Sequence, residues 1–265
     1  MNSSLTKICI ETAAAATLYG LSSCNGILSN AYDEPEEKES VETRAGQLYV
    51  DASDWGMWHY IDLKEVYEAT ENDAAVNPSA LWKHYEIPIT PVEQTEYGKD
   101  KAGIYTYWYD VFGEGISKNE FRDFYLTIAQ PEPEKWSFAV HRNNVRTNGG
   151  EVARTDYHKF EDLPEGTCWT EKLKFHKDEW NEKDVWTIQE RMLSGLIGNQ
   201  GIEINNTLSA WLTIEIPPMP PAFTHKDEIF ILKLADGSMA ALQLENYLSS
   251  TGTKCCLTIN YRYPL

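Results

Sequence analysis

The sequence predicts an all-β domain, mostly antiparallel, that follows a secretion signal and a polar tether. From Gly46 onward, short runs rich in Val, Ile, Tyr, Trp and Thr alternate with turn residues, which is typical of strands. The closing run 256–263 alternates apolar and polar residues, as a half-solvated antiparallel strand does. Residues 65–79 are the best helix candidate, although their apolar spacing is poor for a helix. Removing residues 1–23 from the 265 leaves 242, enough for a substantial core.

Residues 1–23 have the pattern of a lipoprotein signal peptide, so we expect cleavage before Cys24. Lys7 supplies a short basic region, an alanine-rich apolar stretch follows, and Leu21-Ser22-Ser23-Cys24 form a lipobox. A diacylglycerol on the Cys24 thiol would anchor the protein to a membrane without a transmembrane helix. Because the apolar stretch carries Glu11, an ordinary N-terminal helix that ends at the lipobox is the alternative.

Residues 24–45 are expected to form a flexible acidic tether. They contain the run Asp33 to Glu39 and too few apolar residues to offset the entropy of ordering. An acidic tract soon after a lipidated cysteine is similar to the sorting signal of surface lipoproteins, although acidic tethers also occur in proteins that stay inside. The net charge of −18 repels nucleic acid and anionic lipid, which excludes nucleic-acid binding.

The expected strands follow one another with few long connections. They are, in order, 47–50, 58–63, 104–112, 121–128, 136–140, 169–175, 185–188, 211–216, 228–234, 240–244 and 256–263. Gly113-Glu114-Gly115 predicts a hairpin between the third and fourth of these strands, and Asp236-Gly237-Ser238 predicts another further on. Asn148-Gly149-Gly150 tolerates the positive φ of a tight turn.

Three cysteines remain for the folded domain: Cys168, Cys255 and Cys256. Since three is an odd number, at least one stays free or pairs between chains. Cys255 and Cys256 are neighbours in an expected strand, so a bond between them would be strained. A bridge from Cys168 to either remains open, and a zinc site is disfavoured because no CxxC or HxxxH spacing occurs.

Several motifs resemble those of the HmuY-like haemophore lipoproteins. The N-terminal ones are Val50-Asp51-Ala52-Ser53-Asp54, Trp58-His59-Tyr60, and residues 136–142 with 145–150. The C-terminal ones are Trp211-Leu212, Pro217-Pro218-Met219-Pro220-Pro221, Phe223, 229–234, Asp236-Gly237, Tyr247, Thr251-Gly252 and Tyr261-Arg262-Tyr263-Pro264. The resemblance implies one β domain over 46–265 on the cell surface. Such a domain takes haem from host haem proteins and passes it to a TonB-dependent outer-membrane receptor.

The resemblance also implies two axial ligands to the haem iron, histidines in some members and methionines in others. One precedes the Trp-Leu strand and one follows it. No histidine stands in either place here: His141 belongs to a framework motif and is expected to bond a backbone carbonyl, and His225 is a reserve ligand. Met192 and Met219 are therefore the candidates, and Met219 sits on a stiff loop between two proline pairs. The alternative is that both are gap-filling core residues, as we expect for the other two methionines of the domain, at positions 57 and 239.

The expected chemistry is that of a soft, neutral ligand pair. Two thioethers favour ferrous over ferric iron and do not titrate as imidazole does. Trp211 and Phe223, with Trp186, are candidates to cover the porphyrin, although each could be ordinary core. Arg191 is the one cation beside a proposed ligand and could pair with a propionate.

Residues 66–134 form an insertion that is longer than the resemblance leads us to expect. Its aromatic residues either pack as an extra β layer or form a platform for a partner or sugar; they are Tyr105, Tyr107, Trp108, Tyr109, Phe112, Phe121, Phe124 and Tyr125. A surface lipoprotein of the same scaffold that binds a glycan, peptide or protein partner is thus the rival hypothesis. An enzyme is disfavoured, because no G-x-S-x-G, HExxH or P-loop motif occurs.

Overall fold

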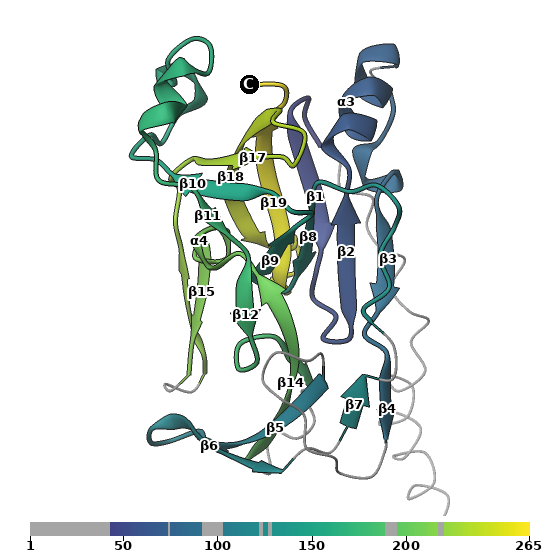
Figure 1. Ribbon diagram of the computed structural model, residues 1–265, viewed down its shortest axis with the longest axis vertical. Helices are drawn as coiled ribbons and strands as arrows, with labels where there is room; N and C mark the ends of the chain where they lie inside the picture. The colour runs from purple at the N-terminus through teal and green to yellow at the C-terminus, as the bar shows by residue number, and fades with distance from the viewer. Residues whose placement is uncertain are drawn as a thin grey trace, which may run out of the picture. The chain divides into compact units, whose positions relative to one another are not determined.

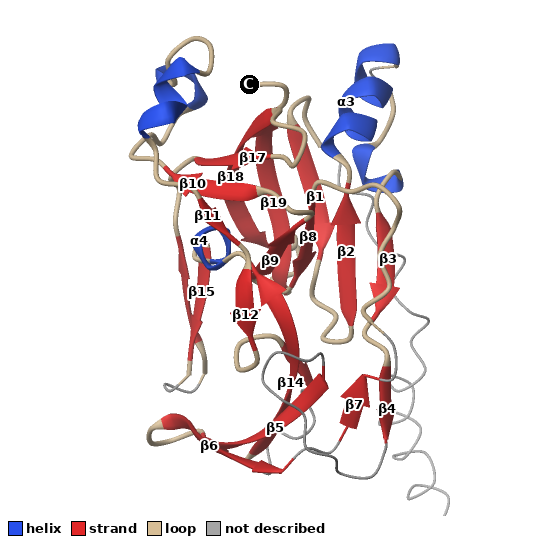
Figure 2. Ribbon diagram, viewed as in Figure 1, coloured by secondary structure: helices blue, strands red, loops and turns tan. Residues whose placement is uncertain are grey.

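The computed structural model describes residues 43–73, 75–91, 103–121, 124–126, 129–188, 195–216 and 220–265. Residues 42–265 form one unit. Within the described ranges the unit is built mainly from antiparallel strands, so the all-β prediction is confirmed (Figure 2). No helix among these residues is long and apolar enough to cross a membrane.

The largest sheet has six strands, and each adjacent pair is antiparallel. Its order is β1 (Gln47–Asp51), β19 (Lys254–Arg262), β18 (Met239–Leu248), β17 (Phe230–Lys233), β10 (Glu151–Arg154) and β11 (His176–Lys177) (Figure 1). Along β19, Leu257 and Ile259 are fully buried whereas Thr258 and Asn260 are partly exposed, as the sequence alternation predicts.

The turn between β17 and β18 confirms the predicted hairpin at Asp236-Gly237-Ser238. Gly237 has φ +87°, a value that glycine adopts without steric cost. Asp236 Oδ1 accepts hydrogen bonds from the backbone N of Ser238 at 3.0 Å and from its Oγ at 2.7 Å. These bonds fix the register of the two strands.

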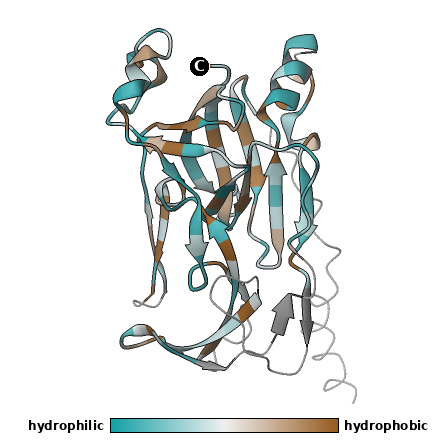
Figure 3. Ribbon diagram, in the orientation of Figure 1, coloured by the Kyte–Doolittle hydropathy of each residue, from teal (hydrophilic) through white to brown (hydrophobic). Residues whose placement is uncertain are grey.

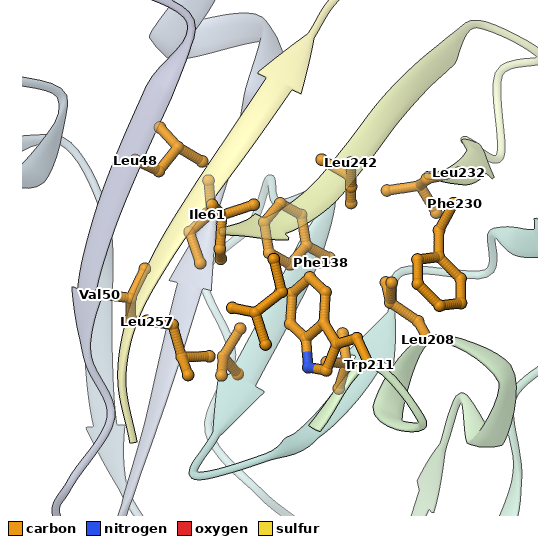
Figure 4. Close-up of a cluster of buried hydrophobic side chains, with 14 of the residues drawn as sticks. Leu48, Val50, Ile61, Phe138, Leu208, Trp211, Phe230, Leu232, Leu242 and Leu257 are labelled. Atoms are coloured by element: carbon orange, nitrogen blue, oxygen red, sulfur yellow. The ribbon is translucent and has the colours of Figure 1, made fainter. Parts of the chain in front are cut away.

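A second sheet contributes the other half of the main core. Its order is β3 (Lys83–Glu86), β2 (Met57–Ile61), β8 (Phe138–His141) and β9 (Asn144–Thr147). Side chains from both sheets and from the short helix α4 (Asn206–Ser209) meet around Trp211 (Figure 4). Figure 3 shows hydrophobic positions along the strands that enclose this core.

The remaining strands form further sheets that include much of the described part of residues 66–134. One has the order β12 (Glu179–Asn181), β14 (Leu196–Ile204), β5 (Gly103–Asp110) and β6 (Gly115–Phe121), with β13 (Trp186–Ile188) also paired to β14. Two further pairs are β15 (Leu212–Glu215) with β16 (Ala222–His225), and β4 (Ile89–Pro91) with β7 (Phe124–Leu126). A hairpin forms around residues 113–115 as predicted, but its second strand is β6 and not the expected strand 121–128, within which β7 pairs with β4.

Helical segments differ most from the prediction. The expected helix 65–79 is α3 (Leu63–Asn72) followed by a 3₁₀ turn, η1 (Pro78–Ala80). Helix α3 begins early because the side chain of Asp62 accepts from the backbone N of Lys64 and caps the N-terminus. The expected strand 169–175 is wrong: after the short η2 (Phe160–Asp162), the chain forms a 3₁₀ helix, η3 (Cys168–Lys172).

Candidate ligand-binding cavity

A cavity of about 480 Å³ lies beside β13 and the β15–β16 pair, a volume typical of small-molecule sites. Strand pairing places two of its apolar lining residues, because Ile214 on β15 lies opposite Phe223 on β16. The polar lining comes from the β8–β9 turn, helix α4, Thr213 of β15, the start of β19 and Asp184 just before β13. The cavity therefore joins segments that are far apart in the sequence.

One wall of the cavity is a stack of two tryptophans. The rings of Trp55 and Trp186 lie 5.9 Å apart at their centroids and are inclined by 18°. The ring of Trp186 is held in place by a hydrogen bond, because its Nε1 donates to the carbonyl of Lys183 at 3.0 Å. Stacked indoles present a flat apolar surface with little rotamer freedom, which suits a planar ligand.

The guanidinium of Arg142 lies over the Trp55 ring. Its guanidinium carbon lies 3.8 Å from the ring centroid, and Nη1 donates to the carbonyl of Ser53 at 2.8 Å. Arg142 adopts φ +55° in the two-residue turn with Asn143, a conformation that tight hairpins require. Burial lowers the pKa of Arg142, but an arginine keeps its charge at physiological pH.

A second cation lines the cavity from the start of β19. Lys254 Nζ lies 4.2 Å from the ring centroid of Phe223, and that ring stacks on Tyr247 with centroids 5.7 Å apart. Asp184 is the acidic residue among the described lining residues, and its Oδ2 accepts from Asn181. Two cations against one carboxylate give the cavity a positive balance in a chain of net charge −18, which favours an anionic ligand.

The predicted site residues divide into three groups. Phe223 lines the cavity, as does Trp186. Trp211 is fully buried in the main core and is not among the lining residues. The others, Met192, Met219, Arg191 and Cys24, lie outside the described residues.

The histidines that could have served as ligands are engaged elsewhere. His141 is fully buried, with Nε2 2.8 Å from the carbonyl of Trp55, and burial lowers its pKa to about 4. The prediction that it bonds a backbone carbonyl is confirmed. His225 Nε2 lies 2.6 Å from the carbonyl of Leu244, and neither histidine lines the cavity.

Trp55, Arg142 and Lys254 are among the lining residues that sequence reasoning missed. Arg142 stands at the end of the motif 136–142, where a basic residue in a tight turn was an available signal. Trp55 follows the motif 50–54 directly and offered the same kind of signal. No signal in the sequence pointed to Lys254, because only the pairing of β18 with β19 and the position of β16 bring it to Phe223.

The three cysteines of the domain are free thiols, and Met239 is a packing residue. Cys168 is exposed, Cys255 and Cys256 are buried, and all three thiols are free, so no bridge from Cys168 forms. Burial raises the pKa of Cys256 to about 11. Met239 packs against a buried cluster of the six-stranded sheet, as expected.

The fold is that of a mostly antiparallel β protein with a cavity of the size that small-molecule sites have. A family model described as HmuY protein matches residues 54–261, and the chain belongs to this family. The prediction from the sequence motifs is thus confirmed. Among curated proteins, none matches the chain.

Several solved structures share the fold. A candidate HmuY-like haem-binding protein from Bacteroides vulgatus is 25% identical, with a TM-score of 0.56 over 85% of this chain and 97% of the other. A candidate lipoprotein from Bacteroides fragilis is 23% identical, with a TM-score of 0.57 over 87% and 99%. The apo HmuY analog of Tannerella forsythia is 18% identical, with a TM-score of 0.55 over 86% and 97%.

Proposed function

We propose that this protein is a haem-binding surface lipoprotein, a haemophore, that holds haem in the cavity beside Trp186 and Phe223. The observation that carries the proposal is the cavity itself, with its aromatic walls and its two cations. Membership of the HmuY family and the similarity to a candidate haem-binding protein support it. Haem is cargo in this account, and the protein is not an enzyme.

The lining of the cavity suits the two parts of a haem molecule. The porphyrin is flat and apolar, and its burial against the Trp55–Trp186 stack and Phe223 contributes on the order of 25 cal/mol for each Å² removed from water. The two propionates are anionic, and Arg142 and Lys254 are placed to bind them. Arg191 is retained in the proposal as a third propionate partner.

Met192 and Met219 are the proposed axial ligands of the iron. Ile216 and Pro221, which both line the cavity, flank Met219 in the sequence, and Met219 is two positions from Pro221. Met192 follows Trp186 by six positions in the sequence, and Trp186 also lines the cavity. Two thioethers would favour ferrous haem and would keep binding it under mildly acidic conditions.

The N-terminal segment supplies the location in this proposal. A lipid on Cys24 anchors the protein to the outer membrane, and residues 24–45 act as a tether that lets the domain work at the cell surface. The partners are host haem proteins, as donors, and a TonB-dependent outer-membrane receptor, as acceptor. The −18 charge disfavours contact with anionic lipid, which keeps the domain available to these partners.

The ligand proposal is tested with an unlipidated mature chain, residues 24–265 with Cys24→Ser. Met192→Leu and Met219→Leu remove the sulfur at nearly constant volume, and Met57→Leu is the matched control on β2. We expect each of the first two variants to change the Soret and Q bands of reduced haem, and the control to match wild type. If both variants bind haem with the wild-type spectrum, the axial pair is wrong.

A non-haem ligand is the second candidate, and the exposed aromatic residues of the insertion favour it. Trp108 is 42% exposed and Phe112 is 90% exposed, whereas Tyr105, Tyr107 and Tyr109 are buried. A glycan, peptide or protein partner bound on this hairpin would be lost in Trp108→Ala and kept in Met219→Leu. A haemophore should show the reverse.

A further inference from the structure

Tyr109 on β5 lies where the insertion meets the cavity. It belongs to a buried cluster in which Tyr105, Tyr107 and Ile197 are its companions and Trp186 and Ile216 pack against them. Tyr105, Tyr107 and Ile197 do not line the cavity, whereas Trp186 and Ile216 do. Tyr109 is only 3% exposed. The cluster therefore supports the cavity from behind.

Three contacts of Tyr109 reach three separate segments. Its backbone N donates to the carbonyl of Gly195, immediately before β14. Its hydroxyl donates to the carbonyl of Ile216 at 2.8 Å, immediately after β15. Its ring meets Trp186 of β13 edge to face, with centroids 5.6 Å apart and planes inclined by 70°.

The hydroxyl bond to Ile216 crosses between two sheets. Strands β15 and β16 form a separate two-stranded sheet, and β5 belongs to the sheet that contains β14. Burial raises the pKa of Tyr109 to about 12, so the hydroxyl stays protonated and remains a donor across the physiological pH range. A carbonyl that loses such a donor loses a hydrogen bond that contributes about 1 kcal/mol to stability.

The positive φ of Gly195 favours a glycine at this contact. Gly195 has φ +82°, and an added Cβ would lie 3.4 Å both from the Trp108 ring and from the carbonyl O of Tyr109. The end of β5 and the start of β14 are thus tightly packed at this point. This packing fixes Tyr109 relative to β14, so its side chain can act as a rigid support.

We propose that Tyr109 is a positioning residue for the cavity, which holds the Trp186 wall and the Ile216 end of β15 at a fixed separation. The insertion would then serve ligand binding by supporting two walls that no strand ladder joins in the described structure. The effect on haem rests on the proposed function, whereas the effect on β15 does not. Tyr109 touches no ligand in this proposal.

The test uses Tyr109→Phe, which deletes the hydroxyl and keeps the ring, in the unlipidated mature chain. Tyr107→Phe is the matched control, because Tyr107 is buried on the same strand and its hydroxyl donates to Glu182 Oε1 at 2.6 Å, away from the cavity lining. The first readout is hydrogen exchange of peptides that cover β13 and β15 in the haem-free protein. The second is the dissociation rate and Soret position of bound haem.

We expect Tyr109→Phe to raise exchange in β15 and to speed haem dissociation about fivefold, the factor that corresponds to one hydrogen bond. Tyr107→Phe should lose similar stability to urea and leave both readouts at wild-type values. Equal exchange and equal dissociation rates in the two variants would overturn the positioning role. If wild type binds no haem, the proposed function fails, and the exchange comparison still decides the role of Tyr109.

Should Tyr109→Phe fail to fold, Trp186→Leu removes the ring contact from the other side. In that variant the bond from Tyr109 to Ile216 has no reason to change, so exchange should rise in β13 and stay low in β15. A rise in both strands would show that they open as one unit, which contradicts separate support by Tyr109.

Discussion

Acidification should weaken the fold through His141. This side chain is completely buried beside the carbonyl of Trp55, and burial lowers its pKa from 6.5 to about 4. Because the unfolded chain takes up the proton at a higher pH than the folded chain does, the stability that neutral His141 contributes is present above pH 6.5 and is lost as the pH falls towards 4. At about 1.4 kcal/mol for each pKa unit, the loss is about 2 kcal/mol at pH 5 and about 3 kcal/mol at pH 4.

The assay is urea unfolding followed by tryptophan fluorescence between pH 7.5 and pH 5, with His141→Gln for comparison. Glutamine keeps an N–H donor for the Trp55 carbonyl but does not titrate. The acidic residues are the same in both proteins, so their contribution cancels in the difference. We expect wild type to lose about 2 kcal/mol more than the variant over this range. If the two proteins lose the same free energy of unfolding, His141 is not held neutral in the folded chain.

Three further predictions concern the cavity and the core. Arg142→Gln should weaken haem binding by roughly tenfold to a hundredfold and Lys254→Gln by about fivefold or less, because buried charge-assisted bonds contribute more than exposed ones. Haem titration measures both effects, and the free energy of unfolding of each variant is the control. Equal losses of affinity in the two variants would contradict the assignment. Cys168 alone should react quickly with a thiol reagent in the folded protein, since the thiols on β19 are buried; three fast thiols would be inconsistent with this. Gly201→Ala should lower the free energy of unfolding by about 1–3 kcal/mol, because the added Cβ would lie 2.5 Å from the Tyr105 ring, and an unchanged urea midpoint would refute the packing.

Much of the fold could be predicted because a strand that buries one face has alternating apolar and polar residues in its sequence. In β19 the alternation of Leu257 and Ile259 with polar residues follows directly from the burial of one face. The strand predicted at residues 169–175 was wrong. Its apolar residues, Trp169, Leu173 and Phe175, do pack on a core cluster, but they do so from a 3₁₀ helix and the connection after it. A short apolar run does not distinguish these conformations.

Strand β14 was missed because polar residues are buried in its middle. Asn199 and Gln200 are fully buried. Gln200 Oε1 accepts from Trp58 Nε1 at 2.8 Å, and its Nε2 donates to Gln130 Oε1 at 3.0 Å. These partners are 142 and 70 positions away in the chain. No local pattern reveals that they satisfy the amide, so a buried strand has the appearance of a polar loop.

The candidate site could be predicted only in part. Phe223 was identified because it stands beside the proline-rich motif, and Trp186 because it is an aromatic residue of an expected strand. The cations were not. Arg142 had a local signal, as a basic residue in a tight turn, whereas Lys254 meets the cavity only after β18 and β19 have paired and left no local signal.

The most direct test of the central claim is a haem titration of the unlipidated mature chain, followed in the Soret and Q bands under oxidising and then dithionite-reducing conditions. The account predicts a saturable one-to-one spectral change that sharpens on reduction, as a pair of thioether ligands requires. No spectral change in either redox state would contradict it, and would direct attention to the exposed aromatic residues of the β5–β6 hairpin.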